Sequence, residues 1–222
     1  MPVENQTLAP FYSNGRNPYN YARFEQISRD VATPWLTLEE ITQQLNLFDD
    51  ESQDTYLSSL ELAVRMTIED ILGMAIFSTQ WNVYYANFGM YDTTLYLDLP
   101  ETGVNITGYP AVTINNVRYY GSSNTTPITI SSTDYSYDPT GSRVILNVAL
   151  NELSQQVANP IVVTYTQNAN PLATYPVVKQ AGLMLLTHLY NTRSTVGDTV
   201  GMKSEIPFGV HALLRPYKPL VM

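Results

Sequence analysis

The chain has 222 residues, 44% of them hydrophobic, which is enough for one large domain or two small ones with a substantial core. It contains no cysteine, which excludes disulfides, thiolate nucleophiles and cysteine-ligated zinc. The net charge is -9, and residues 1–101 hold 4 Lys and Arg against 15 Asp and Glu. Such a surface repels phosphate backbones, so tight DNA binding is not expected, although an acidic wall could face DNA without gripping it.

No stretch approaches the roughly 18 uninterrupted apolar residues that a membrane helix needs. The start, MPVENQTLAPFY, lacks the basic and apolar regions of a signal peptide. We therefore expect a protein that is neither secreted nor embedded in a membrane.

Residues 1–35 show no helical or strand period and are interrupted by several prolines. They also carry aromatic side chains, namely Phe11, Tyr12, Tyr19, Tyr21 and Phe24. Disordered tails are usually poor in aromatics, while termini are commonly loose. Two interpretations stand, an extended arm that docks onto a partner or neighbouring subunit and a flexible end, and the aromatics favour docking.

The first helix is predicted to begin at WLTLEEITQQLNL. Thr37 can cap the helix, and Glu40 three residues later completes a capping box. Leu36 can pack on Ile41 across the cap as a hydrophobic staple. The apolar pattern stops near Asn46, which predicts a helix of about three turns.

A second, longer helix is predicted after the acidic connector FDDESQD. Apolar residues recur at three- and four-residue steps from Leu57 to Leu72, so the helix is amphipathic and ends near Gly73. Glu61, Arg65 and Glu69 are assigned to its other, polar side. The acids before it are interpreted as partners of the helix dipole, because the glycine and final glutamate of a calcium loop are missing.

From Gln80 to Thr166 the apolar period changes to two, with turn sequences such as ETG, YGSSN and DPTGS between the runs. This spacing predicts about six antiparallel strands in a small sandwich or curled sheet.

Helix is predicted again over YPVVKQAGLMLLTHLYNTR, with Pro176 at its first position. Its middle, AGLMLL, is apolar on every side, so it must be buried on every side. A domain of this size covers only part of such a helix, which predicts burial against another subunit as well. The interface residues assigned here are Leu183, Met184, Leu186 and Tyr190.

Together these elements predict an α+β fold. A small helical bundle, formed by two N-terminal helices and the return helix, carries an inserted antiparallel β domain, an extended N-terminal arm and a C-terminal tail. The predicted division is 1–35 (arm), 36–79 (first bundle part), 80–173 (β domain), 174–198 (second bundle part) and 199–222 (tail).

Residues that could support catalysis are few. His188 and His211 lie 23 residues apart without a second ligand at helical spacing, which is typical of structural histidines. Asp98 with Glu101, and Asp134 with Asp138, are the paired carboxylates, and turn aspartates usually bond their own backbone. We therefore expect no enzyme, no cofactor and no metal.

The order of these motifs resembles the head-tail connector proteins of tailed bacteriophages, also called adaptor or head-completion proteins. The resemblance rests on five segments across residues 36–218: LTLEEITQQLNL with DDES, IEDILGMAIFSTQW, TINNVRYYG with DYSYD, VVKQAGLMLLTHLYNTR, and IPFGVHALLRPYK. Two departures are LGMA at 72–75, in place of the usual Thr-Gly-Arg, and a longer N-terminal arm.

The resemblance implies a structural virion protein made in the host cytoplasm and placed in the neck. It would form a ring with itself, commonly of twelve copies, beneath the portal protein and above tail or neck proteins. Double-stranded DNA would pass through without tight binding, along a channel that the acidic helices line with Glu61, Glu69 and Asp70. The aromatic arm could lie across an adjacent subunit or the tail.

In proteins of that family the C-terminal segment contacts the portal, and the corresponding segment of this chain is IPFGVHALLRPYK. This carries over to Ile206, Phe208, Leu213, Leu214, Arg215, Tyr217 and Lys218. Phe, Tyr and Arg are residue types that anchor interfaces. The alternative is that the segment folds back and Leu213 and Leu214 complete the chain's own core.

Two other functions remain open from the residues alone. Tyr-rich strands and Trp81 are compatible with a glycan-binding β module carrying helical decoration. A glycosidase using Asp134 or Asp138 ranks third.

Overall fold

A computed structural model describes residues 20–48, 51–91, 94–100, 102, 111–122, 126–148, 152–192 and 207–218. The chain forms two compact units, each built from segments far apart in sequence. The sheet unit comprises Met1–Ser28 and Thr79–Asn168, and the helical unit comprises Arg29–Ser78 and Ala169–Met222. Helices and antiparallel sheets are both present, so the predicted α+β class is confirmed.

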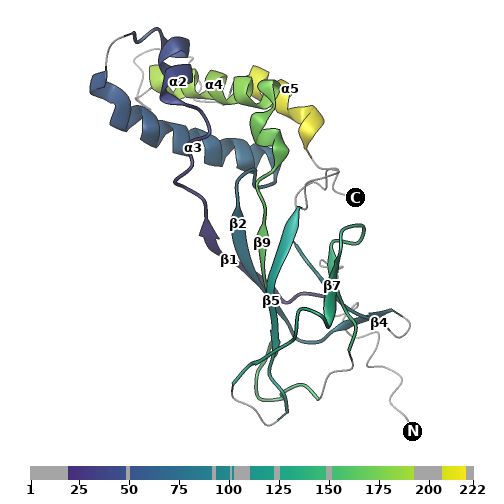
Figure 1. Cartoon of the computed structure of the whole chain (residues 1–222). Coiled ribbons are helices and arrows are strands. Elements are labelled where there is room, and N and C mark those ends of the chain that lie inside the picture. Colours follow the sequence, from purple (N-terminus) through teal and green to yellow (C-terminus); the bar gives the residue numbers. More distant parts are fainter. Residues whose placement is uncertain are drawn as a thin grey trace, which may run out of the picture. The chain divides into compact units, whose positions relative to one another are not determined.

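Among its described residues the helical unit contains four α-helices, and α3 and α4 run alongside each other (Figure 1). The helices are α2 (Leu38–Leu45), α3 (Asp54–Leu72), α4 (Pro176–Asn191) and α5 (Phe208–Leu214). Three short 3-10 helices accompany them: η1 (Glu51–Gln53), η2 (Pro171–Thr174) and η3 (Arg215–Tyr217).

The predicted helix ends are confirmed. Thr37 and Glu40 form a reciprocal capping box at the start of α2. Asn46 ends that helix with a left-handed φ of 56°, and Gly73 ends α3 with a φ of 72°. Pro176 is the first residue of α4. Each of these ends follows from a local backbone requirement, which explains why sequence alone locates them.

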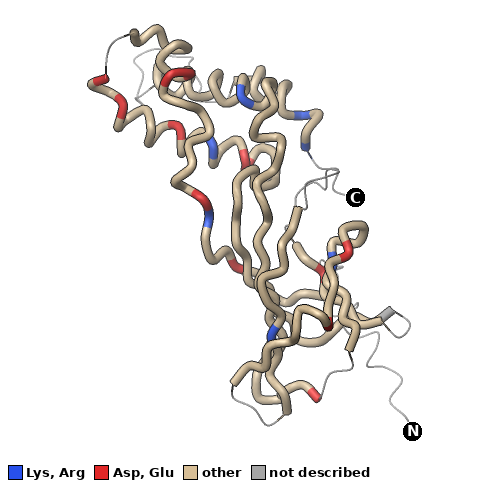
Figure 2. The backbone as a smooth tube through the Cα atoms, viewed as in Figure 1, with Lys and Arg blue, Asp and Glu red and all other residues tan. Residues whose placement is uncertain are grey.

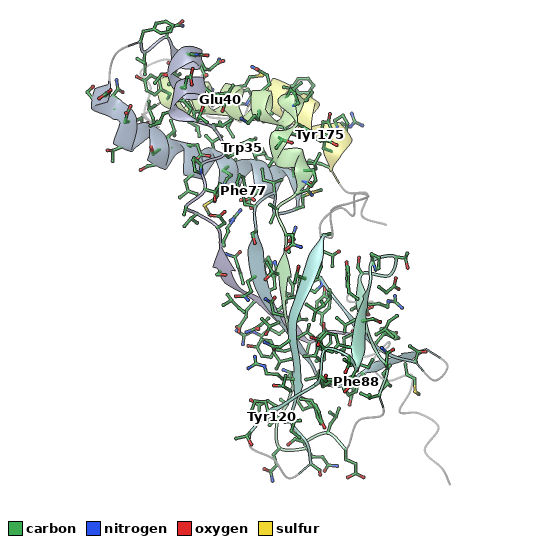
Figure 3. All side chains as sticks on the ribbon, in the orientation of Figure 1. Trp35, Glu40, Phe77, Phe88, Tyr120 and Tyr175 are labelled. Atoms are coloured by element: carbon green, nitrogen blue, oxygen red, sulfur yellow. The ribbon has the colours of Figure 1, made fainter. Side chains whose placement is uncertain are left out.

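Trp35 is the largest side chain in the core of the helical unit (Figure 3). Its Nε1 donates to the carbonyl of Ala173 at 2.8 Å, and its ring lies against the backbone of α4. A Cβ added at Gly182 would lie 2.6 Å from Trp35 Cη2, so glycine is required for this close approach. The indole therefore joins the segment before α2 to the segments that lead into and form α4.

The sheet unit contains two antiparallel sheets that share one hydrophobic core. Their orders are β1-β2-β9-β5-β6 and β3-β4-β8-β7. The strands are β1 (Arg23–Arg29), β2 (Thr79–Tyr85), β3 (Gly89–Tyr91), β4 (Thr94–Asp98), β5 (Val112–Tyr119), β6 (Ile128–Thr129), β7 (Tyr135–Asp138), β8 (Arg143–Leu146) and β9 (Ile161–Gln167). β9 is central, and all but one of its seven residues are buried. This arrangement is the small sandwich that the alternation predicts.

Two sequence expectations are corrected here. Residues 79–167 hold eight strands among those described, where about six are expected, and the three-residue β3 is too short to show an alternation. Residues 20–35 are also not part of a free arm: β1 joins the larger sheet, and Trp35 and Leu36 are buried in the helical core. Strand β1 escapes the pattern because it lies at a sheet edge and is exposed on both faces. Residues 1–19 of the predicted arm lie outside the described residues.

Asp98 holds the start of the described chain against β4. Its carboxylate accepts the N–H of Asn20 at 3.3 Å and lies 3.5 Å from Arg143 Nε. Asn20 in turn donates from Nδ2 to the carbonyl of Tyr96 at 2.9 Å and accepts the N–H of Asp98 at 2.9 Å. Burial raises the pKa of Asp98 above its ordinary value, and the Asn20 N–H and Arg143 only partly oppose it.

This raised pKa predicts the pH dependence of an Asp98→Asn variant. Between the ordinary Asp value of 3.8 and the higher folded value, the folded carboxyl binds more protons than the unfolded one. The contribution of Asp98 to stability therefore falls as pH rises through that window. We expect the free energy of unfolding of the variant, measured relative to the natural chain by urea titration, to increase across the window and then level off. A difference that decreases with rising pH would show that the Arg143 pair outweighs burial.

Candidate partner-binding surfaces

The predicted channel acids Glu61 and Glu69 on α3 are buried, so they cannot line a channel. Glu61 Oε1 accepts the backbone N–H of Trp35 at 2.9 Å and of Leu36 at 3.3 Å. Glu69 Oε1 accepts the N–H of Ile76 at 2.8 Å and of Phe77 at 3.1 Å, while its other oxygen pairs with Arg29. Both carboxylates bind backbone of their own unit.

Arg65 lies one helical turn from each of these glutamates and is also buried. Its guanidinium donates to the carbonyl of Thr33 at 2.7 Å and to that of Asp30, and it lies 4.2 Å from the centroid of the Phe77 ring. Burial lowers the pKa of Arg65 from its ordinary value, and the coulombic effect of Glu61 opposes it. We call Glu61, Arg65 and Glu69 the α3 clamp, because together they bind the segments before α2 and after α3.

The assignment of the α3 clamp to the polar side of the helix is wrong, because its side chains lie on the same face as the apolar residues. Positions 61, 65 and 69 follow Leu57 at four-residue steps, so a helix of 3.6 residues per turn places them on the side of Leu57. The exposed residues Tyr56, Met66 and Asp70 mark the opposite side. Of the predicted channel acids only Asp70 is exposed.

The four predicted interface residues of α4 fall into two groups, one buried in the core and the other partly accessible. Leu186 is fully buried in the core of its own unit, so its assignment to a subunit interface is corrected. Leu183, Met184 and Tyr190 are half-buried, pack against that core and keep part of their surface accessible. The apolar helix α4 is thus covered mainly by α3, α5 and Trp35. The sequence pattern did not predict that α5 is a helix or that it packs on α4.

The predicted portal-binding residues likewise fall into a buried group and an exposed group. Leu214 is buried and Leu213 packs on the same core, so the alternative interpretation holds for them. Phe208 is 85% exposed, and Arg215 and Lys218 are exposed. Ile206 lies outside the described residues.

The exposed part of this segment forms a surface with the start of α4. Tyr217 packs edge-on against Tyr175, with ring centroids 5.9 Å apart. Figure 3 shows Tyr175 near the C-terminal end of α5. Figure 2 shows basic positions at that end, whereas acidic positions spread along α2 and α3. We call Tyr175, Phe208, Arg215, Tyr217 and Lys218 the tail surface. Tyr175 is not among the predicted site residues, because no sequence pattern distinguishes a binding tyrosine from any other tyrosine that precedes a helix.

The carboxylates considered for sugar cleavage serve turns. Asp138 accepts from the N–H and hydroxyl of Thr140, and these bonds lower its pKa from its ordinary value, the opposite of what a general acid needs. Asp134 precedes β7 and Asp138 is its last residue, so their Cα atoms are about 13 Å apart at 3.3 Å per residue. Trp81 is half-buried and contacts Phe24, with ring centroids 5.7 Å apart, so it offers no open platform for a sugar.

Neither a metal site nor a membrane span is found in the part of the chain that the structure describes. His188 is half-buried and His211 is exposed on α5, and no group of three or more His, Asp or Glu residues there could hold a metal ion. None of the described helices combines the length and apolar character required to cross a bilayer.

Comparison with solved structures shows that this fold occurs in particle necks. The chain matches one in the neck of an empty gene transfer agent (GTA) particle computed with C6 symmetry at TM-score 0.60, covering 90% of this chain and 97% of that one. A chain from the virion of a native GTA particle matches at 0.58, over 90% and 96%. A chain from a native GTA neck computed with C12 symmetry matches at 0.50, over 90% and 97%. All three are 18% identical to this chain, so the likeness establishes a shared fold.

The sequence comparisons add nothing to this assignment. No protein family matches the chain, and no curated protein is similar to it.

Proposed function

We propose that this chain is a structural neck protein of a phage-like particle, a head-tail connector that forms a ring beneath the portal and leaves a channel for the genome. The observation that carries the proposal is a fold shared with GTA neck chains over 90% of this chain and 97% of theirs. A match of both chains over nearly their whole length supports an equivalent part rather than a shared fragment. The predicted bundle parts, β domain and tail belong to this proposal, as does the part of the predicted arm at residues 1–19.

Ring formation is the first step of the proposed function. The neck structures computed with C6 and C12 symmetry favour a ring of repeated copies, commonly twelve. In a closed ring each copy uses two different surfaces, one for each neighbour. The accessible parts of Leu183, Met184 and Tyr190 are candidates for one of them.

Passage of DNA without tight binding is consistent with the charge of the chain. The net charge of -9 disfavours counterion release from a phosphate backbone. Exposed acids such as Glu39, Glu51 and Asp70, rather than Glu61 and Glu69, would supply the repulsion.

The experiment that tests the proposal is assembly with the portal protein from the same particle. The purified chain, alone and mixed with portal, is examined by mass measurement and electron microscopy. A ring on the portal supports the proposal, and a chain that stays monomeric and ignores portal contradicts it.

The tail surface is the proposed contact with the portal. Deleting the segment would also remove Val210 and Leu214 from the core, so point variants are the sharper test. We expect Phe208→Ser and Arg215→Glu each to weaken portal binding about tenfold or more, as interface anchors do. Unfolding by urea should be unchanged, and Glu39→Gln, an exposed acid on α2, serves as the control. Normal portal binding by both variants would exclude the tail surface as the contact.

A further inference from the structure

The exposed side of α3 carries almost no charge. Its exposed residues Tyr56, Ser59, Ala63, Met66 and Asp70 follow one another at three- and four-residue steps, so they lie on one side of the helix. The side of a surface helix that faces water usually carries charged residues. Here the one exposed charge is Asp70, in the last turn, whereas Tyr56 is 40% exposed and Met66 is 42% exposed. We call these five residues the α3 strip.

The composition of the α3 strip suits contact with another protein. The other charged residues in the middle of α3 form the α3 clamp and are buried in the chain's own helical unit. The core of a protein interface is likewise depleted in charged residues and enriched in tyrosine and methionine. Ser59 and Ala63 are small and lie between Tyr56 and Met66, so a second helix can approach closely between two larger side chains.

Two parts of the helical unit carry opposite charge. Residues 36–73 contain Arg65 as their one base, and it is buried, so the exposed charged residues of α2, η1 and α3 are all acidic. Helices α4, α5 and η3 contain no acid, and their Lys and Arg residues are Lys179, Arg215 and Lys218. Figure 2 shows this division, with red positions along α2 and α3 and blue positions on α4 and at the end of α5. The α2–α3 part of one copy is therefore complementary in charge to the α4–α5 part of another.

We infer that the α3 strip packs against the accessible side of α4 in the next copy of the ring. This deepens the proposed function and rests on it, because the ring supplies the neighbour. The accessible side of α4 is uncharged too: Gln180, Leu183, Thr187 and Asn191 follow one another at three- and four-residue steps. We call these four residues the α4 strip. A closed ring needs two different surfaces on each copy, and the two strips supply them.

The charge pattern favours this head-to-tail contact over a face-to-face pair of α3 strips. Two α3 strips placed together would bring the acidic residues of α2, η1 and α3 of both copies close to one another. Like charges facing each other across an interface are unfavourable. The same complementarity operates within one copy, where Lys179 of α4 pairs with Glu40 of α2 at 2.6 Å.

The absence of natural cysteine allows a cross-linking test. Ala63→Cys is placed in one preparation and Gln180→Cys or Thr187→Cys in a second, size-tagged one, and the two are mixed with portal and oxidised. We expect a mixed disulfide dimer at several times the yield obtained when Ser58→Cys replaces Ala63→Cys. Ser58 is the control because it is exposed on α3 but lies outside the α3 strip.

Two neighbouring serines give a matched test of the α3 strip. Ser58 and Ser59 are both exposed, and their hydroxyls donate to the carbonyls four residues earlier, at 2.8 and 3.0 Å. Ser59→Arg places a large basic side chain opposite the basic α4–α5 part of the next copy. We expect it to lower the fraction of chain found in rings on portal several-fold, while Ser58→Arg leaves that fraction unchanged. Urea unfolding should be the same for both variants, and equal ring formation by both would contradict the inference.

The outcomes separate the inference from the proposed function. If the natural chain forms a ring on portal but no mixed dimer exceeds the Ser58→Cys control, the contact between strips is overturned and the connector function stands. If Ala63→Cys cross-links mainly to itself, the α3 strips pair face to face and the inference fails. Slow alkylation of Ala63→Cys in the isolated chain would show that the chain covers its own strip, which also overturns the inference. If no ring forms at all, both fail.

Discussion

Replacing Glu69 by alanine is expected to lower the free energy of unfolding by about 3–5 kcal/mol, the usual cost of breaking a buried charge pair. The change removes the carboxylate that accepts the N–H groups of Ile76 and Phe77 and that pairs with Arg29. Each buried donor left unsatisfied adds its own desolvation cost. Urea unfolding followed by circular dichroism measures the effect.

Asp70→Ala is the matched control, because Asp70 is the next residue on the same helix and is exposed. We expect its effect to stay within about 0.5 kcal/mol, as for other surface substitutions. Glu69→Gln should be intermediate, since an amide oxygen can still accept but the charge opposite Arg29 is lost. Similar losses for Glu69→Ala and Asp70→Ala would contradict the clamp.

Replacing Trp35 by alanine is expected to cost about 3–5 kcal/mol, the range for truncating a large aromatic side chain in a core. The indole fills the space that Gly182 leaves open on α4 and bonds Ala173. Trp35→Phe keeps part of the ring but removes the Nε1 donor, so it should cost about 1–2 kcal/mol for the unsatisfied carbonyl and lost contact. Thermal unfolding distinguishes the two variants.

The control for Trp35 is Phe48→Ala, at an aromatic side chain that is 68% exposed. Its truncation should leave the melting temperature nearly unchanged. If Trp35→Ala behaved like Phe48→Ala, the indole would contribute little to the core of the helical unit.

Features that depend on a few neighbouring residues were predictable from sequence. The capping box at Thr37, the left-handed ends at Asn46 and Gly73, and Pro176 at the start of α4 each follow from the backbone needs of one helix end. The strands around the central β9 were predictable because burial against one core imposes alternation on them. The α+β class follows from these elements together.

The candidate site was predictable only in part, because exposure depends on what packs against a residue. Phe208, Arg215 and Lys218 remained accessible, whereas Leu214 and Leu186 entered the core of their own unit. A leucine in an interface and a leucine in a core look the same in sequence. Tyr175 joined the surface only because η3 folds back onto the start of α4.

By itself, the sequence determined the helix ends, the change from helical to strand periodicity, the acidic charge and the absence of cysteine chemistry. These are local or summed properties, which no packing arrangement alters. The tertiary structure alone decided that Glu61, Arg65 and Glu69 bind backbone rather than face outward, and that residues 23–29 form an edge strand. Glu61 and Arg65 bind backbone more than twenty residues away, and residues 23–29 pair with a distant strand. Glu69 binds backbone only seven and eight residues on, but only after the chain turns back at the end of α3. The helical period alone indicates none of these partners.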